Sequence, residues 1–238
     1  MLYKMKINLN QKLINLIEYY NLINANFLLR DSPLNRTNKS SAYTFTGTKL
    51  EKLNKLKKKI QLIKNCNLKK NATNLVFGDG NINSKLMIIG EGPGANEDAK
   101  GKPFVGRAGK LLDKMLAAIQ LDRTKVYISN VVNYRHPANR RPTDAEIEKY
   151  LPYLKSHIEI INPKILFLLG SSALNTLIGN DVVISKARGK WIQKEIGTVK
   201  PWIIASFHPA FLMRQPEQKK LSWIDLKMIR EKSKILKI

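Results

Sequence analysis

The stretch KLMIIGEGPGANED, residues 85–98, joins an apolar run to a glycine-rich loop. Further apolar runs follow it along the chain, at residues 125–132, 164–169 and 202–207. Their continuous content of Ile, Val and Leu is typical of strands that are buried on both faces. Segments with helical spacing of apolar residues separate the runs, at residues 108–120, 143–161 and 171–178. The alternation predicts an α/β fold, a three-layer α/β/α sandwich with a mainly parallel central sheet.

One of the predicted helices carries its own start signal. The sequence TDAE at residues 143–146 forms a capping box, in which the side chain of Glu146 reaches back to the amide of Thr143. We therefore expect a helix to begin at this point.

The first 60 residues differ from the rest of the chain. Leu and Ile recur at helical spacing between Asn10 and Asn26 and again between Thr48 and Lys64, with a polar linker at residues 31–40. We expect two parts: an N-terminal helical extension with its linker at residues 1–60, and one α/β domain at residues 61–238.

The chain is strongly basic. Its 238 residues include 42 Lys and Arg against 18 Asp and Glu, which gives a formal charge of +24 and a pI near 10.1. Such a charge indicates a polyanionic partner, most simply nucleic acid. A coding bias towards Lys, Asn and Ile is the alternative explanation, because lysines scattered over a surface define no groove.

Cysteine content and hydropathy exclude several classes of protein. Cys66 is the single cysteine, so this chain alone makes neither a disulfide framework nor an all-cysteine zinc or iron–sulfur site. No apolar run reaches the ~18 residues that a membrane span needs, and the N-terminal MLYKMKINLNQ has no signal-peptide stretch. We expect no membrane association and a cytoplasmic, nucleoid-associated location.

Polar or glycine-rich loops follow three of the predicted strands. They read GEGPGANED at residues 90–98, NYRHPANRRP at residues 133–142 and HPAFLMRQP at residues 208–216. Ligands of open α/β sheets bind outside the carboxyl ends of the strands, so these loops predict one common site.

Individual residues in or near these loops each have a structural and a functional interpretation. They include Phe104 in the glycine-rich stretch 101–109 and Asn130 at the end of the second predicted strand. Phe104 is either a core anchor or a platform on which a base stacks. Asn130 is either a strand cap or an amide that reads a pyrimidine edge. His208 is either a satisfied histidine at a strand end or a catalytic group, whereas His136 and His157 look like loop and helix-surface residues.

The sequence lacks the motifs of two classes of hydrolase. Ser206 lies near His208, a pair that suggests a serine hydrolase, but no G-x-S-x-G elbow is present. No H-E-x-x-H or H-x-E…C-x-x-C pattern occurs either, which excludes a zinc hydrolase or a zinc deaminase.

Together the motifs resemble the family 4 uracil-DNA glycosylases, the thermostable-type, iron–sulfur class of their superfamily. The resemblance rests on VFGDGN (76–81), GEGPGANED (90–98), GKPFVGRAGKLL (101–112), VYISNVVNYRHPANRRP (126–142), RGKW (188–191) and FHPAFLMRQP (207–216). It implies an α/β/α fold and a base excision repair enzyme. Such an enzyme hydrolyses the N-glycosidic bond of deoxyuridine in DNA, releases uracil and leaves an abasic site.

The resemblance also implies roles for the residues that bind the base. Phe104 would stack on the flipped uracil, Asn130 would hydrogen-bond its polar edge, and His208 would stabilise the charge on the departing base. Glu91 and Gly92 occupy a motif in which other uracil glycosylases carry a water-positioning Asp. Without that Asp, Glu91 and backbone carbonyls are the candidates for activating water.

Further implied roles concern specificity and DNA contact. Glu97 would crowd a 5-methyl group and so exclude thymine. The residues expected to contact DNA are Leu212 and Met213, which would enter the duplex, and Arg214, Arg135 and Arg140, which would lie near phosphates.

The chain departs from the family at the positions of its [4Fe–4S] cluster. Ile63, Tyr134 and Tyr150 stand where three of the four cysteines are expected, and Cys66 matches the remaining one. Ligation of the cluster requires thiolates, and a neutral Tyr of pKa ~10 is no ordinary substitute. We therefore expect no metal and no cofactor, with Ile63, Tyr134 and Tyr150 packed together beside a buried Cys66 thiol.

Two alternatives to a glycosylase remain open from the sequence. One is a DNA-binding relative of the same fold with reduced catalysis. The other is a relative that bonds covalently to uracil-DNA, although the basic insertion of that type is absent here. For the glycosylase, the expected partner is uracil-containing DNA, single- or double-stranded, bound by a monomer.

Overall fold

The computed structural model describes residues 14, 43, 45–64, 66–179 and 182–238. The predicted helix between Asn10 and Asn26 and the predicted linker lie outside these residues, apart from Ile14. The chain divides into two units, Met1–Lys39 and Ser40–Ile238. Helix α2 (Lys49–Gln61) lies in the second unit and packs against α6 (Asp144–Ile161). The α/β unit therefore begins before α2 and not at the expected residue 61, because the apolar face of α2 is buried in the core.

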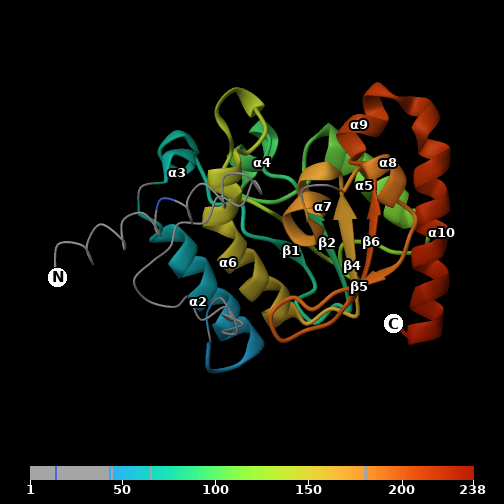
Figure 1. Cartoon of the computed structure of the whole chain (residues 1–238), viewed down its shortest axis with the longest axis horizontal. Helices are drawn as coiled ribbons and strands as arrows, with labels where there is room; N and C mark the ends of the chain where they lie inside the picture. Colours follow the sequence, from blue (N-terminus) through green and yellow to red (C-terminus); the bar gives the residue numbers. More distant parts are fainter. Residues whose placement is uncertain (1–13, 15–42, 44, 65, 180–181) are drawn as a thin grey trace. The chain divides into compact units, whose positions relative to one another are not determined.

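Six strands form one mixed sheet in the order β1-β3-β2-β4-β6-β5 (Figure 1). The four central strands are parallel, and the two-residue edge strands pair antiparallel to them. The strands are β1 (Asp79–Gly80), β2 (Leu86–Gly90), β3 (Tyr127–Asn130), β4 (Ile165–Leu169), β5 (Ile192–Gln193) and β6 (Trp202–Ser206). The predicted fold class is confirmed: an α/β fold whose sheet is mainly parallel.

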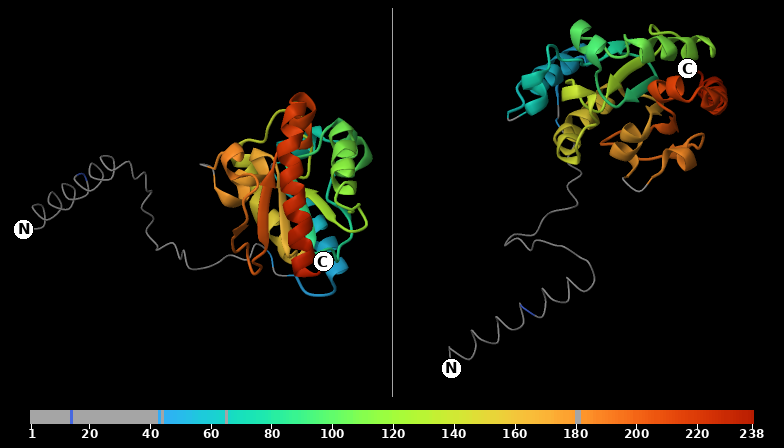
Figure 2. Two further views of the ribbon diagram at one scale, coloured as in Figure 1. Left: turned by 90° about the vertical axis from the view of Figure 1, so that its right-hand side faces the viewer. Right: turned by 90° about the horizontal axis from the view of Figure 1, so that it is seen from above.

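Helices cover both faces of the sheet. The remaining helical elements are α3 (Asn67–Asn71), α4 (Ala95–Lys100), α5 (Arg107–Ala117), η1 (Pro137–Asn139), α7 (Ser171–Ile178), α8 (Ile184–Ala187), α9 (Pro209–Arg214), η2 (Pro216–Gln218) and α10 (Lys219–Leu236). The left view of Figure 2 shows α10, in red, lying in front of the strands. The predicted capping box at the start of α6 is confirmed, with Thr143 N donating to Glu146 at 2.8 Å.

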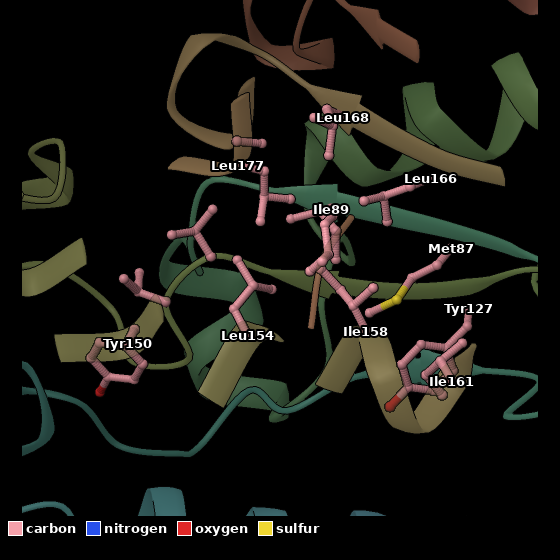
Figure 3. Close-up of a cluster of buried hydrophobic side chains, with 14 of the residues drawn as sticks. Met87, Ile89, Tyr127, Tyr150, Leu154, Ile158, Ile161, Leu166, Leu168 and Leu177 are labelled. Atoms are coloured by element: carbon pink, nitrogen blue, oxygen red, sulfur yellow. The ribbon is translucent and has the colours of Figure 1, made fainter. Parts of the chain in front are cut away.

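Each central strand is buried on both faces because its successive side chains enter two different cores. Met87 and Ile89 of β2 pack in one core with residues of α2, α6 and α7, and Figure 3 shows them near Ile158 of α6. Ile88, between them, packs in the other core with residues of α5 and α10. This arrangement explains the continuous apolar runs.

The sheet register brings four strand ends to one edge. Gly90 at the end of β2 pairs with Asn130 at the end of β3, and Leu169 of β4 pairs with Ser206 of β6. The loops that follow these strands therefore meet at a single place, as the sequence predicts.

His136 lies on a loop, as expected, whereas the expectation that His157 lies on a helix surface is wrong. Both are buried, with 3% and 2% exposed. His157 stacks on Phe77 with the ring centroids 4.3 Å apart, and its Nε2 lies 2.9 Å from the hydroxyl of Tyr127. Burial lowers the pKa of His157 to about 3. A polar residue on a helix that faces a sheet can thus be a core residue if it has a partner.

Among the described residues, none of the helices combines the length and the apolar character required to cross a bilayer.

Candidate active site

A cavity of about 560 Å³ opens at the carboxyl ends of the central strands. It brings together eight of the residues predicted from the sequence, namely Glu91, Gly92, Glu97, Phe104, Asn130, Arg140, His208 and Arg214. These come from loops that are up to 123 positions apart in the sequence, between residues 91 and 214. The predicted common site is therefore a physical cavity at the sheet edge.

The ring of Phe104 lies close to β2, in space that two glycines leave free. Its φ is +53°, in the left-handed region, and its carbonyl accepts a hydrogen bond from the guanidinium of Arg123. A Cβ on Gly90 would lie 2.5 Å from the Phe104 ring, and one on Gly109 would lie 1.8 Å from the Phe104 carbonyl oxygen. Only glycine leaves enough room at these two positions. Gly90 and Gly109 therefore allow the Phe104 ring to lie at the cavity.

Asn130 presents an amide oxygen with no protein partner. The residue is 3% exposed, and its Oδ1 is buried without a hydrogen bond. An unsatisfied buried acceptor costs roughly 1–3 kcal/mol, so such atoms in native structures call for an explanation. A ligand in the cavity that donates a hydrogen bond would supply the missing partner. The cap interpretation does not account for this atom.

His208 is held as a neutral imidazole with a defined tautomer. It is the N-cap of α9, and its Nδ1 accepts a hydrogen bond from the amide of Ala210 at 3.2 Å. The proton of the neutral ring is therefore on Nε2. Burial, with a smaller contribution from Arg214, lowers the pKa of His208 to about 4, against the opposing effect of Glu91 and Glu97. At pH 7 the ring thus offers a neutral N–H donor next to Phe104, whose centroid is 5.5 Å away.

Glu91 follows β2 and is oriented by the start of α7. The hydroxyl of Ser172 donates a hydrogen bond to its carboxylate, and the amide of Val132 donates to its carbonyl at 3.2 Å. Ser172 was not predicted from the sequence, because the Gly-Ser-Ser that follows β4 reads as an ordinary strand–helix turn. Its contact with Glu91 places a fixed negative charge at the cavity wall.

Glu97 links the two glycine-rich loops of the cavity. Its carboxylate accepts hydrogen bonds from the backbone amides of Gly94 at 3.2 Å, Val105 at 2.8 Å and Gly106 at 2.7 Å. Gly94 and Gly106 are the N-caps of α4 and α5. The carboxylate thus neutralises two helix N-termini at once, and it fixes the loop that carries Phe104.

The model of the uracil DNA glycosylase superfamily matches residues 77–227, well over half of the chain. The chain belongs to this superfamily. Among its relatives, the type-4 uracil-DNA glycosylase of Archaeoglobus fulgidus is 39% identical over 76% of this chain and 94% of its own length. Those of Thermotoga maritima and Sulfurisphaera tokodaii are 45% and 40% identical, over 63% and 76% of this chain and 77% and 85% of theirs.

One residue that this uracil DNA glycosylase homologue was expected to push into a duplex is not available for that purpose. Leu212 is 1% exposed and packs in the core between the sheet and α10, so the expectation for Leu212 does not fit its position. Met213, the next residue, is only partly buried, and Arg214 is exposed. Successive residues of α9 point to different sides of the helix. The sequence pattern alone does not show which of these sides faces the core.

The basic residues of the 135–141 loop differ in their availability. Arg140 makes a two-pronged ion pair with Glu146, at 2.8 and 2.6 Å, and this pair lowers the pKa of Glu146 to about 2. The Nε of Arg135 donates to Asn139 at 3.0 Å. Arg141 is exposed and lines the cavity, although we did not single it out from the sequence.

The positions at which the resemblance implies cluster cysteines hold one buried group of side chains. Ile63, Cys66, Tyr134 and Tyr150 all belong to the same core, and the Cys66 Sγ lies 3.3 Å from the Tyr150 hydroxyl. Burial raises the pKa of both tyrosines, so they are neutral at physiological pH. Within the described ranges, no group of three His, Cys, Asp or Glu could hold a metal ion. These residues do not fit a [4Fe–4S] cluster, because they supply a single sulfur.

Proposed function

We propose that this chain is a uracil-DNA glycosylase that hydrolyses the N-glycosidic bond of deoxyuridine in DNA. The observation that carries the proposal is the juxtaposition, in one cavity, of the Phe104 ring, the unpartnered amide of Asn130 and the neutral imidazole of His208. A flat hydrophobic surface, an amide and a neutral donor match the three features of a uracil ring: its face, its polar edge and its O2.

Recognition begins when the deoxyuridine leaves the base stack. Flipping costs a few kcal/mol, least for a mispaired or unpaired base, so both double- and single-stranded DNA supply the substrate. The base then stacks on Phe104. The N3–H of uracil donates to the orphan Oδ1 of Asn130, which thereby gains the partner it lacks in the free protein.

Bond cleavage leaves a negative charge on uracil and a positive charge on the sugar. The electron pair of the C1′–N1 bond goes to the base, and the Nε2–H of His208 hydrogen-bonds the O2 of the resulting anion. A preorganised donor of this kind contributes ~2.7–4 kcal/mol to transition-state stabilisation by analogy with oxyanion holes. The Glu91 carboxylate, held by Ser172, stabilises the oxocarbenium-like sugar.

We propose that the DNA backbone lies across the rim of the cavity. Arg214 and Arg141 are exposed there and are suited to phosphate contacts. Met213 replaces Leu212 as the apolar side chain beside the flipped nucleotide. We propose that the protein acts as a monomer, since one chain supplies all these groups.

The chain is further proposed to work without an iron–sulfur cluster. The packing of Ile63, Cys66, Tyr134 and Tyr150 supports this proposal, because these side chains fill a common core through their own contacts.

Uracil release from defined oligonucleotides tests the proposed function. We expect the purified chain to release free uracil, and we expect Asn130→Ala and His208→Ala to slow release ~10²–10³-fold each. Phe104→Ala is expected to slow it as well, with the circular dichroism spectrum unchanged. DNA binding without any product would favour the relative with reduced catalysis, and a protein–DNA adduct on a denaturing gel would favour the covalent type. Wild-type excision by all three variants would contradict the assigned roles.

A further inference from the structure

His136 is a buried imidazole that lines the uracil cavity and has no assigned role. It is 3% exposed, and its Nε2 is buried with no hydrogen-bond partner among the described residues. The other two histidines each have such a partner: His157 contacts Tyr127 and His208 contacts Ala210. Leaving a buried polar group without a hydrogen bond costs free energy. We therefore expect a ligand in the cavity to supply the hydrogen bond that this histidine lacks.

The surroundings of His136 place it beside the Glu91–Gly92 segment. A Cβ on Gly92 would lie 3.0 Å from the Cε1 and 3.4 Å from the Nδ1 of His136. The imidazole therefore occupies the space into which a side chain at position 92 would project. Gly92 leaves that space free, and His136 fills it from the neighbouring loop.

The backbone after His136 is held in an unusual conformation. Ala138 and Asn139 have φ values of +52° and +54°, in the region that favours glycine. The amide of Asn139 donates to the His136 carbonyl at 3.1 Å, which closes the turn. Strained backbone of this kind persists at functional sites, where it fixes the direction of a side chain.

The charge state of His136 suits an acceptor. Burial, more than the nearby Arg140, lowers its pKa below the usual 6.5, while Glu146 and Glu91 act in the opposite direction. The ring is therefore neutral at pH 7 and keeps one nitrogen with a free lone pair.

Hydrolysis requires a component for which the other residues of the cavity do not account. Phe104, Asn130 and His208 are engaged with the base, and the exposed arginines suit phosphates. The attacking water still needs an acceptor that orients its lone pair towards C1′. The Glu91 carboxylate, whose Oε2 accepts from Ser172, is assigned above to the sugar cation. His136 lies beside it as a neutral acceptor for the water.

We propose that His136 is a positioning residue that holds the attacking water through a ring nitrogen. The inference rests on the proposed glycosylase function and extends it. The C1′–N1 bond breaks with its electron pair on uracil, the water oxygen bonds to C1′, and the proton lost by the water neutralises the uracil anion. His136 orients the water and is unchanged at the end.

Two substitutions separate a hydrogen-bonding role from a packing role. His136→Phe keeps a flat ring of similar size and removes both nitrogens, whereas His136→Gln keeps a polar atom near the position of Nε2. Single-turnover uracil release is measured for each variant, together with affinity for DNA that carries a non-cleavable 2′-fluorodeoxyuridine. We expect His136→Phe to slow release at least about tenfold with affinity within about twofold of wild type, and His136→Gln to recover most of the rate.

Competition by a second nucleophile provides a readout that a structural role would not change. When methanol is added, we expect His136→Phe to give a larger share of methyl glycoside than the wild-type chain, because the water is no longer held. An unchanged rate and an unchanged methanol share in His136→Phe would overturn the inference, and so would parallel losses of rate and affinity in both variants. Failure of the wild-type chain to release uracil would instead overturn the proposed function, so the two failures are distinct.

Discussion

At the scale of single residues, burial decides the chemistry of the three histidines. His157 and His208 have pKa values lowered to about 3 and about 4, chiefly by burial, and His136 is shifted in the same direction. All three rings are therefore neutral in the folded protein at pH 7. Only the environment distinguishes them: His157 is a satisfied core residue, and the other two face the cavity.

The shifted pKa of His157 predicts a loss of stability in acid. Its folded pKa of about 3 lies below the unfolded value of 6.5, so the unfolded chain takes up a proton first as the pH falls. The stability that the neutral ring contributes is complete above pH 6.5 and decreases towards pH 3, by up to about 1.4 kcal/mol per pH unit. Urea unfolding between pH 8 and 4.5 measures this slope.

His157→Phe provides the control for this prediction. The variant loses the contact with Tyr127 and is expected to be less stable at pH 8. Its stability should depend less steeply on pH below 6.5 than that of the wild type. Equal slopes for the two proteins would show that His157 is not the group responsible.

At the scale of elements, Glu97 joins the N-termini of α4 and α5. Its three backbone hydrogen bonds fix the loop that presents Phe104, so the residue has a structural role in addition to the proposed exclusion of thymine. Glu97→Ala is expected to release some thymine from G·T pairs, because it removes the volume that crowds the 5-methyl group. It is also expected to slow uracil release about tenfold, since three amides lose their acceptor.

Glu97→Gln separates the two effects. Glutamine keeps the volume, so thymine should stay excluded. Its carbonyl oxygen can still accept from Val105 and Gly106, but its amide nitrogen cannot accept from Gly94. Uracil release by Glu97→Gln is therefore expected to be slowed less than release by Glu97→Ala. Release assays on G·U and G·T duplexes measure both properties. Thymine inactivity of Glu97→Ala together with retained uracil release would remove Glu97 from the exclusion role.

Elements with strong local signals are the ones that sequence reasoning predicts well. The buried runs that become β2, β3, β4 and β6, and the capping box of α6, need only short-range information. The edge strands β1 and β5 have two residues each and depend on pairing with distant partners. The burial of Leu212 likewise depends on where α9 meets α5 and α10, which no local pattern contains.

The residues of the candidate site also divide into those with a local sequence signal and those that depend on distant contacts. Phe104, Asn130 and His208 could be predicted because each lies in a recognisable local motif: a glycine-rich loop, the end of β3 and the loop after β6, respectively. His136 and Ser172 could not, since their importance comes from contacts with the Glu91–Gly92 segment, which is distant in sequence. Tertiary contacts, and not residue types, identify these two.

At the scale of the whole molecule, the charge of +24 predicts salt-sensitive DNA binding. Log affinity should fall linearly with log salt, with a slope of about −0.9 per phosphate contact. Arg214→Ala at the cavity rim is expected to make the slope shallower by about one unit, as fluorescence anisotropy with duplex DNA can measure.

Lys234→Ala is the control for Arg214→Ala, because it also removes one positive charge. Lys234 is exposed near the end of α10, where the neighbouring Leu236 carbonyl accepts from Lys164 at the amino end of β4. It thus lies at the opposite edge of the sheet from the cavity, and its loss should leave the slope unchanged. Equal effects of the two variants, or a flat response of the wild type, would mean that the charge is a compositional bias and not a DNA-binding surface.

We propose that this uracil-DNA glycosylase works without an iron–sulfur cluster. Ile63, Cys66, Tyr134 and Tyr150 pack together at the positions where the family resemblance implies the cluster cysteines. The most direct test is a single assay of uracil release by chain purified without oxygen, with iron counted in the same preparation. We predict colourless protein with no stoichiometric iron that releases free uracil from a uracil-containing oligonucleotide, with or without a chelator. A brown preparation with about four irons per chain, or iron-free protein that leaves the uracil in place, would contradict the account.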